Sequence, residues 1–322
     1  MTAYAADLAA VRRAAIRVAP FVRRTPVLTS GTLDGLAGRQ LYFKCENLQK
    51  TGSFKYRGAT NAVQSLGADV AARGVVTHSS GNHAQALALA AAVRGVPAHV
   101  VMPRTAPAVK KAAVLGYGAS VVECEPTLAA REAAARRLVE ETGGSLIPPF
   151  DHPDVIAGQG TACLELLDEV PDLDAVVVPV GGGGLLGGFA VAGRGVKPTL
   201  RLFGAEPELA GDAALSKARN ERQPALPPGS IADGLLTALG ELTWPIVRDQ
   251  VEAVHTVREA EIVAAMRLVW ERMKLLIEPS AAVGVAVCLS ERFESLDGMQ
   301  RVGVVLCGGN VGLDKLPWPE GS

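Results

Sequence analysis

Two kinds of hydrophobic pattern alternate along the chain from about residue 74. Short runs rich in β-branched residues are followed by longer stretches rich in alanine and leucine. The short runs predict strands at residues 74–78, 97–102, 119–122 and 145–147, and the longer stretches predict helices at 83–94, 108–116 and 127–141. Strands separated by helices of this length are typical of right-handed βαβ units on a parallel sheet.

A second series of strands and helices follows residue 153. Residues 174–180 are apolar after Asp174 and predict a strand that is buried on both faces, as in the middle of a parallel sheet. Further strands are predicted at 200–205, 251–257 and 301–306, and a loop rich in proline and glycine is predicted at 223–230. We therefore expect an α/β protein built from two halves.

Composition limits the possible functions. The 322 residues carry 32 basic and 33 acidic side chains, a net charge of −1, so no positive field attracts nucleic acid or an acidic membrane surface. The apolar share of 48% predicts a substantial core. No apolar run approaches the roughly 20 residues that cross a bilayer, and the charges scattered over residues 1–24 lack the block layout of a secretory signal. We expect a cytoplasmic protein without nucleic-acid or membrane partners.

The cysteines form an odd, dispersed set without a C-x-x-C pair, which speaks against a disulfide framework or a zinc site. Unpaired cysteine usually packs as a small hydrophobic residue. We expect this for most of the five: Cys45, Cys124, Cys163, Cys288 and Cys307.

A glycine run follows the strand predicted at 174–180. Gly182, Gly184 and Gly187 have the spacing of the dinucleotide fingerprint, and Glu206 follows at the end of a later strand. Taken alone, this pattern indicates an NAD-dependent enzyme. In physical terms it indicates an anion site at a helix N-terminus, where backbone N–H groups approach a phosphate. Close packing of a helix on a strand, with no ligand, is the alternative.

Lys55 directly follows Thr-Gly-Ser-Phe and lies in the first turn of a predicted helix. Desolvation and the positive end of the helix dipole both lower the pKa of an amine, and this suits covalent chemistry on a carbonyl carbon. A Ser-Phe-Lys tripeptide by itself is no argument, because most lysines are solvated surface charges.

Two further segments carry groups that can contact a ligand. Residues 78–85 (HSSGNHAQ) place hydroxyl, amide and imidazole groups between a strand and a helix, where they can hold a small carboxylate. A serine-rich helix cap is the ordinary alternative. Residues 304–310 form a strand that runs into a Gly-Gly turn, so a ligand could approach Cys307 closely.

Together these segments resemble the fold-type II pyridoxal-phosphate (PLP) enzymes, and within them the serine racemase and serine/threonine dehydratase group. The resemblance spans nearly the whole chain and is carried by five blocks in the same order: QKTGSFKYRG at 49–58, THSSGNH at 77–83, VIAGQGT at 155–161, PVGGGG at 179–184 and VWERMKLLIEP at 269–279. It implies a tryptophan synthase beta-like fold of two interleaved domains whose parallel sheets are flanked by helices. A large PLP-binding domain would comprise residues 1–70 and 150–322, and a small substrate-binding domain residues 71–149.

The resemblance also implies roles for single residues. Lys55 would bind the PLP aldehyde covalently and then act as the base on the substrate's α-proton, and Ser80 would stand on the opposite face of the ring. Phe54 would flank the ring, and Asn82 would bond its phenolic oxygen. The phosphate would be held by the glycine turn and the residue after it: Gly181, Gly182, Gly183, Gly184 and Leu185.

Substrate and metal contacts follow from the same resemblance. Four residues would hold the substrate carboxylate, and two more are further substrate contacts: Ser79, Ser80, Asn82 and His83, then Arg131 and Asp233. Glu206, Asp212 and the main-chain oxygen of Ala210 match a divalent-cation site, and such hard oxygen ligands suit Mg²⁺ or Ca²⁺. Without the resemblance, the two acids would be interpreted as a solvated loop.

Cys307 departs from the family pattern. It stands where a serine hydroxyl usually meets the pyridine nitrogen, and a thiol is the weaker hydrogen-bond donor. A neutral partner still fits an unprotonated pyridine, which suits concerted elimination.

The same residues serve two reactions. Elimination of water from serine, threonine or a related β-hydroxy amino acid needs the lysine and an acid for the departing hydroxyl, whereas racemisation needs two bases on opposite faces. Our main hypothesis is a PLP-dependent ammonia-lyase that gives a 2-oxo acid and ammonia. The alternative is a serine racemase with elimination as a side activity, and an NAD-dependent oxidoreductase is a remote third. The family also implies a homodimer.

Overall fold

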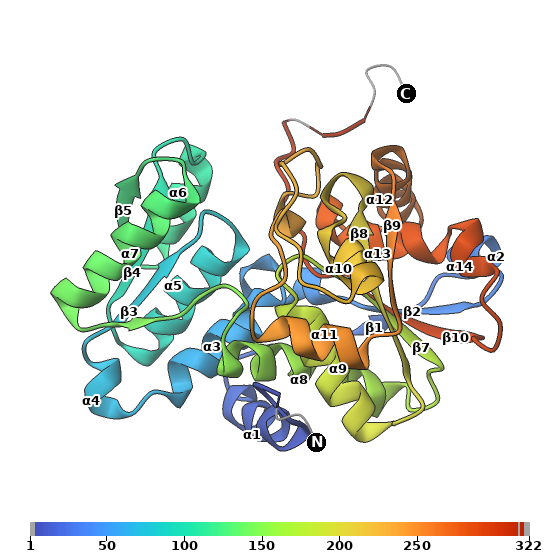
Figure 1. Ribbon diagram of the computed structural model, residues 1–322, viewed down its shortest axis with the longest axis horizontal. Coiled ribbons are helices and arrows are strands. Elements are labelled where there is room, and N and C mark those ends of the chain that lie inside the picture. Colours follow the sequence, from blue (N-terminus) through green and yellow to red (C-terminus); the bar gives the residue numbers. More distant parts are fainter. Residues whose placement is uncertain (1–3, 315, 319–322) are drawn as a thin grey trace.

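The computed structural model describes residues 4–314 and 316–318. Two separate sheets, each flanked by helices, make up the fold (Figure 1). The smaller sheet and its helices lie on the left in that view and the larger sheet on the right. The fold is the expected α/β type with parallel sheets flanked by helices. The proposed domain limits at residues 70 and 150 remain a prediction.

The larger sheet has six strands in the order β1-β2-β10-β7-β8-β9. All neighbours are parallel except the edge strand β1, which runs antiparallel to β2. Its strands are β1 (Val27–Leu28), β2 (Gln40–Lys44), β7 (Ala175–Pro179), β8 (Arg201–Pro207), β9 (Ala253–Val257) and β10 (Arg301–Val305). The sheet therefore combines strands from both ends of the chain.

The smaller sheet has four parallel strands in the order β5-β4-β3-β6. They are β3 (Val75–His78), β4 (Ala98–Pro103), β5 (Ser120–Cys124) and β6 (Ser145–Leu146). Every strand of this sheet was predicted from the hydrophobic runs, and so were β7 to β10 of the larger one. β1 and β2 were not predicted, because two residues are too few to show a pattern and β2 begins and ends on polar residues.

Helices cover both sheets. They are α1 (Leu8–Val18), α2 (Gly31–Ala37), α3 (Lys55–Ser65), α4 (Ala68–Ala71), α5 (Asn82–Arg94), α6 (Ala108–Gly116), α7 (Leu128–Thr142), α8 (Pro153–Glu169), α9 (Gly184–Val196), α10 (Asp212–Arg219), α11 (Thr243–Gln250), α12 (Glu259–Met273), α13 (Pro279–Cys288) and α14 (Glu291–Glu294). Four short 3₁₀ turns occupy 46–48, 50–52, 208–210 and 233–235. The loop predicted at 223–230 has no helix or strand.

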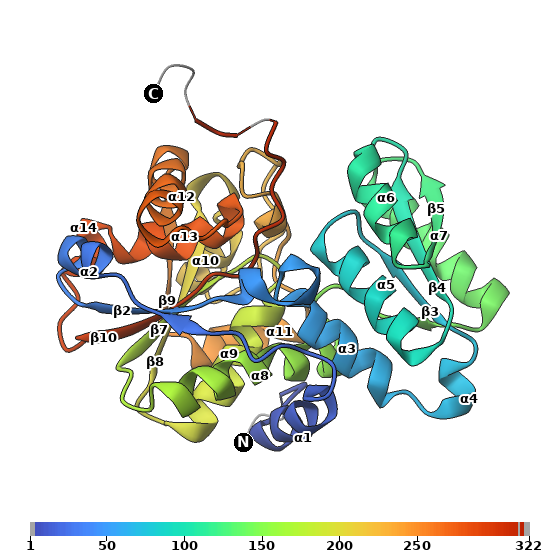
Figure 2. The same ribbon diagram turned by 180° about the vertical axis from the view of Figure 1, so that it is seen from behind.

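Helix α3 lies between the two sheets. It packs against α5, which covers the smaller sheet, and against α8 of the larger part, and both views show it at the junction (Figures 1 and 2). Helix α13 lies above the larger sheet in these views and α9 lies below it, and both helices contact β7 and β8. A residue at the start of α3 is therefore held where the two parts of the molecule meet.

Burial follows the predicted pattern. All five residues of β7 are buried, as expected for a strand covered on both faces, and so are all five cysteines, which are free thiols.

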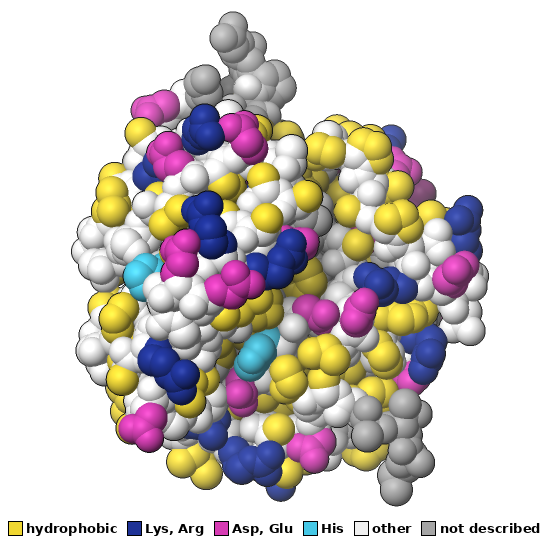
Figure 3. All heavy atoms as spheres, turned by 60° about the vertical axis from the view of Figure 1, so that its left-hand side comes forward, with side chains coloured by type: hydrophobic (Ala, Val, Ile, Leu, Met, Phe, Trp, Pro, Cys, Tyr) yellow, Lys and Arg dark blue, Asp and Glu magenta, His cyan; other side chains and the backbone are white. Residues whose placement is uncertain are grey.

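No helix among the described residues is long and apolar enough to span a bilayer. On the face shown in Figure 3, basic and acidic side chains are interspersed, in keeping with the net charge of −1.

Candidate active site

Lys55 is the first residue of α3, and the backbone before it is fixed by the end of β10. The N–H of Phe54 donates to the carbonyl of Cys307 over 3.0 Å, and Ser53 forms an isolated antiparallel bridge with Gly308. Beyond Lys55, the N–H of Gly58 donates to Gln159 Oε1 over 3.0 Å. The predicted lysine is thus attached to the carboxyl end of a central strand, where α/β sheets bind ligands.

The surroundings of Lys55 lower the pKa of its amine. Its Nζ donates to the carbonyl of Pro149 over 2.9 Å and lies 5.0 Å from the centre of the Phe54 ring. Burial lowers the pKa of Lys55 to about 8, against the opposing effects of Cys307 and Glu278. A larger share of the amine is therefore neutral and nucleophilic at neutral pH than for a surface lysine.

The glycine run at 181–184 joins β7 to α9 and is buried. Gly183 has a φ of +84°, and a Cβ there would lie 2.7 Å from Leu239. A Cβ on Gly182 would overlap the ring of Phe150. Among the described residues, the backbone N–H groups of 181–185 donate to no other protein group. Buried N–H groups need acceptors, so this turn offers the N-terminus of α9 to an anion.

Residues 79–81 join β3 to α5, and Asn82 and His83 are the first two residues of α5, so the strand end and the helix start fix the position of the whole segment. Ser79 and Ser80 are half-buried, and Ser79 Oγ accepts from the N–H of Gly81 over 3.3 Å. His83 Nε2 hydrogen bonds to the carbonyl of Ile147 over 2.9 Å, while Nδ1 is buried without a partner among the described residues. Burial, and next the charge of Lys55, lower the pKa of His83 to about 3, so this imidazole is neutral at pH 7.

Glu278 belongs to the same site, although it was not among the predicted site residues. It precedes α13, is 4% exposed, and accepts from Asn82 Nδ2 over 3.0 and 3.2 Å and from the N–H of Asn310 over 3.2 Å. Burial raises its pKa to about 7. The sequence does contain a signal for this residue. Glu278 follows Leu276 and Ile277 and precedes Pro279, and a lone acid in such an apolar run indicates a buried carboxyl.

Cys307 lies beside Lys55, after the end of β10. It is 2% exposed, and burial raises the pKa of its thiol well above the usual range. The thiol is therefore neutral, as expected for a neutral partner of a pyridine nitrogen. Its contact with that nitrogen remains a prediction.

The three residues predicted to bind a metal lie at the end of β8 and just beyond it: Glu206 belongs to β8, Ala210 ends the 3₁₀ turn at 208–210, and Asp212 begins α10. Glu206 is buried and accepts from the N–H groups of Ala213 and Ala214 over 3.0 and 2.9 Å. Asp212 is 1% exposed, and neither of its carboxylate oxygens has a partner among the described residues. Burial raises the pKa of Glu206 to about 8 and that of Asp212 to about 6. Ala210 is also buried. No cluster of three or more His, Cys, Asp or Glu residues that could hold a metal occurs in the described part of the chain.

The two further predicted substrate contacts come from separate elements, the 3₁₀ turn at 233–235 and α7. Asp233 is exposed and forms an ion pair of 3.0 Å with Lys110, which joins the 3₁₀ turn at 233–235 to α6. Arg131 lies on α7, and its Nε is buried without a partner among the described residues. Burial, and next the charge of Arg131, lower the pKa of His78, which directly precedes Ser79.

The family model described as "Pyridoxal-phosphate dependent enzyme" matches residues 18–308. The chain belongs to this family. Serine racemase of Homo sapiens is 52% identical over 315 residues, which cover 96% of this chain and 93% of that protein. The structure of serine racemase from Dictyostelium discoideum matches with a TM-score of 0.93 and 49% identity, over 96% of this chain and 100% of that chain. The structure of a threonine deaminase from T.th. matches with a TM-score of 0.90 and 46% identity, over 96% and 100% of the two chains.

The residues present fit the cofactor of this family. A partly buried amine, Lys55, and five unpartnered N–H groups at 181–185 provide the two attachments that an aldehyde and a phosphate require. The glycine run, which alone indicated an NAD enzyme, therefore lies in a PLP-dependent enzyme.

The comparisons also reverse the order of our two main hypotheses. Serine racemases match nearly the whole chain, which favours the racemase alternative over the ammonia-lyase that we ranked first. The match to a threonine deaminase keeps elimination among the expected reactions.

Proposed function

We propose that this chain is a PLP-dependent serine racemase that also eliminates water from serine or a related β-hydroxy amino acid. The observation that carries the proposal is a lysine with lowered pKa at the start of α3, where the preceding residue, Phe54, is hydrogen bonded to Cys307 just after β10. Near-full-length similarity to serine racemases supports the choice of reaction.

Residues of the site would hold the cofactor at both ends. Lys55 would bind its aldehyde, and Gly181 to Leu185 its phosphate, with Phe54 beside the ring, Asn82 at its phenolic oxygen and Cys307 at its nitrogen. When bound, pyridoxal phosphate withdraws electrons from the substrate's Cα and so acidifies the proton there.

The protein's own groups would then move protons. Ser79, Ser80, Asn82 and His83 would orient the substrate carboxylate, with Arg131 and Asp233 as further contacts. Lys55 would remove the α-proton from one face, and Ser80 would return a proton from the other, which inverts the centre. If the β-hydroxyl leaves first, the products are the 2-oxo acid and ammonia.

Chiral analysis separates the two reactions. Purified protein is incubated with L-serine, and D-serine and pyruvate are quantified together. We expect both products, and Ser80→Ala should lose D-serine formation while keeping pyruvate release, because elimination does not use the second base. Pyruvate without D-serine in the wild type would reject the racemase and restore the ammonia-lyase.

We propose further that Glu206, Asp212 and the main-chain oxygen of Ala210 bind Mg²⁺ or Ca²⁺. The unpartnered oxygens of Asp212 support this, because a buried carboxylate requires a cation or donors. Chelation should lower the Tm and the activity, and Mg²⁺ should restore both. A Tm and an activity that chelation leaves unchanged would reject the metal site.

The assembly and compartment complete the proposal. We propose a homodimer in the cytoplasm, and the family resemblance supports the assembly. Sedimentation equilibrium of the holoenzyme tests the first point: a mass near 33.4 kDa, that of one chain, would reject the dimer.

A further inference from the structure

Behind the start of α3 lies a cluster of four charged side chains that the proposed reaction does not use. We call it the Arg57 cluster; it consists of Lys44, Glu46, Arg57 and Glu165. Arg57 Nε and Nη2 donate to the two oxygens of Glu46, each over 2.8 Å. Its Nη1 and Nη2 donate to the two oxygens of Glu165, each over 2.7 Å. Lys44 Nζ donates to Glu165 over 2.6 Å. Two positive and two negative charges therefore balance.

The cluster joins separate segments of the fold. Lys44 ends β2, Glu46 begins a 3₁₀ turn, and Glu165 lies on α8. The chain before β1 also takes part, because the carbonyl of Thr25 accepts from Lys44 over 2.7 Å and that of Arg23 accepts from Arg57 over 3.2 Å. All these segments are thereby tied to one residue of α3, two positions after Lys55.

The position on the helix matters. Successive residues of an α-helix are about 100° apart, so Arg57 leaves α3 on nearly the opposite side from Lys55. Lys55 bonds to Pro149, whereas Arg57 bonds to Glu46 and Glu165. The cluster therefore holds the first turn of α3 from behind and leaves the side that carries the amine free for the cofactor.

Stability alone does not explain such a cluster. Arg57 and Glu46 side chains are fully buried, and taking charges out of water costs more than well-packed apolar residues of similar size would. What the ions provide is geometry, because a guanidinium bonded to two carboxylates has one orientation. Among the described residues, no side chain caps the start of α3. The fixed orientation of the Arg57 guanidinium can therefore hold the first turn of the helix in place of a cap.

We propose that Arg57 is a positioning residue for Lys55, which it serves by fixing the first turn of α3 through its paired bonds to Glu46 and Glu165. This inference rests on the proposed function, in which Lys55 binds the cofactor and moves the α-proton. A displacement of about 1 Å from a change remote from the chemistry can cost on the order of 100-fold in rate.

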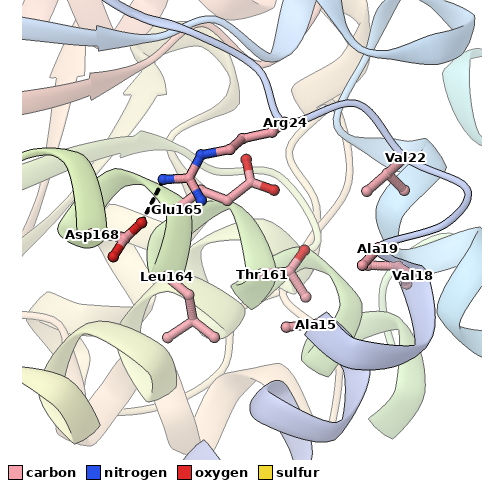
Figure 4. Close-up of a pocket in the computed structure, with 9 residues that line it drawn as sticks. All are labelled: Ala15, Val18, Ala19, Val22, Arg24, Thr161, Leu164, Glu165 and Asp168. Carbon is pink, nitrogen blue, oxygen red and sulfur yellow. Dashed lines mark hydrogen bonds and ion pairs between the residues drawn. The ribbon is translucent and has the colours of Figure 1, made fainter.

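One member of the cluster is open to water. A cavity of about 410 Å³ lies between α1 and α8, and Glu165, Arg24 and Asp168 line it (Figure 4). The Glu165 side chain is 16% exposed, whereas Arg57 is fully buried. Glu165→Gln is therefore the milder variant, since water from the cavity can solvate the new amide while Arg57 and Glu46 keep both of their bonds.

The test compares two cluster variants with a destabilised control. Arg57→Lys keeps the charge but loses the forked geometry, and Glu165→Gln removes one of the two carboxylates that hold Arg57. Ile262→Ala removes buried side-chain volume on α12, far from α3 in the fold. For each holoenzyme we would measure the Tm, kcat and KM for serine, and the midpoint of the pH titration of the visible absorption.

We expect all three variants to lower the Tm. Arg57→Lys should lower kcat by about 10-fold or more with KM within about twofold, and should shift the titration midpoint, because the amine has moved. Glu165→Gln should show the same changes in smaller size, and Ile262→Ala should keep the wild-type kcat and midpoint.

The inference is overturned if Arg57→Lys has the kcat and midpoint of Ile262→Ala at equal loss of Tm. Should Arg57→Lys fail to fold, Glu165→Gln decides by the same measurements, and wild-type values there would overturn the inference too. Wild-type protein without visible absorption or activity would instead overturn the proposed function itself.

Discussion

Replacing Glu278 with glutamine should remove a pH dependence that this carboxyl adds to the free energy of unfolding. Its pKa is raised from 4.5 to about 7, chiefly by burial, while bonds from Asn82 and Asn310 oppose the shift. The folded protein therefore holds a proton that the unfolded chain has released between these two values. Because the folded state binds more protons there, stability falls as pH rises through this window.

The size of the effect follows from the two pKa values. A group with a pKa of 4.5 unfolded and about 7 folded contributes about 2 to 3 kcal/mol more stability at pH 5 than at pH 8, at roughly 1.4 kcal/mol per unit of pKa shift. Glu278 is 4% exposed, so solvent screens this contribution little. Glutamine has nearly the same shape and does not titrate.

Urea unfolding of wild type and E278Q at pH 5, 6, 7 and 8 measures this directly. The difference in unfolding free energy between the two proteins should shift by about 2 to 3 kcal/mol over this range, with the wild type relatively more stable at pH 5. Asp233→Asn, at an exposed acid near Glu278, is the matched control and should show a far smaller shift. A difference between wild type and E278Q that stays constant with pH would refute the reasoning.

Three further predictions follow from the site. Lys55→Ala should lose activity by at least about 1,000-fold and the visible absorption with it, because no other amine replaces the nucleophile, and its far-UV circular dichroism should match the wild type. In protein freed of the cofactor, labelling of Lys55 by an amine reagent should rise through pH of about 8, where burial places its pKa, rather than near 10.5. Gly182→Ala should lower stability by about 1 to 3 kcal/mol, because the new methyl overlaps Phe150, and should weaken retention of pyridoxal phosphate about 10-fold or more in dialysis.

Each of these predictions has an outcome that contradicts it. Activity and colour retained by Lys55→Ala would remove this residue from the chemistry. Labelling that rises only near pH 10 would mean that the amine is solvated. Gly182→Ala with the wild-type Tm would show that the turn can open to accept a side chain, and Gly312→Ala, where a Cβ would meet nothing within 4 Å, is its control.

Most of the fold and several residues of the candidate site could be predicted from the sequence. The alternation of apolar runs located β3 to β10 and the helices α5 to α7, because strand and helix periods are local properties. The strands β1 and β2 were not predicted, since β2 pairs with β10, which lies about 260 positions away along the chain, and β1 pairs with β2 at the edge of the sheet. Glu278 was missed although it interrupts an apolar run, because its contacts with Asn82 and Asn310 exist only in the folded chain.

By itself, the sequence determined the α/β class, the lysine after Ser53-Phe54 and the glycine turn, because each depends on residues adjacent in the chain. Tertiary structure alone decided which charged side chains are buried and which residues they contact. Lys55 has a lowered pKa because segments distant in the chain bury its amine, and Arg57 is held because Glu46 and Glu165 converge on it. Desolvation and charge pairing depend on distance in space, which the order of residues does not contain until the chain has folded.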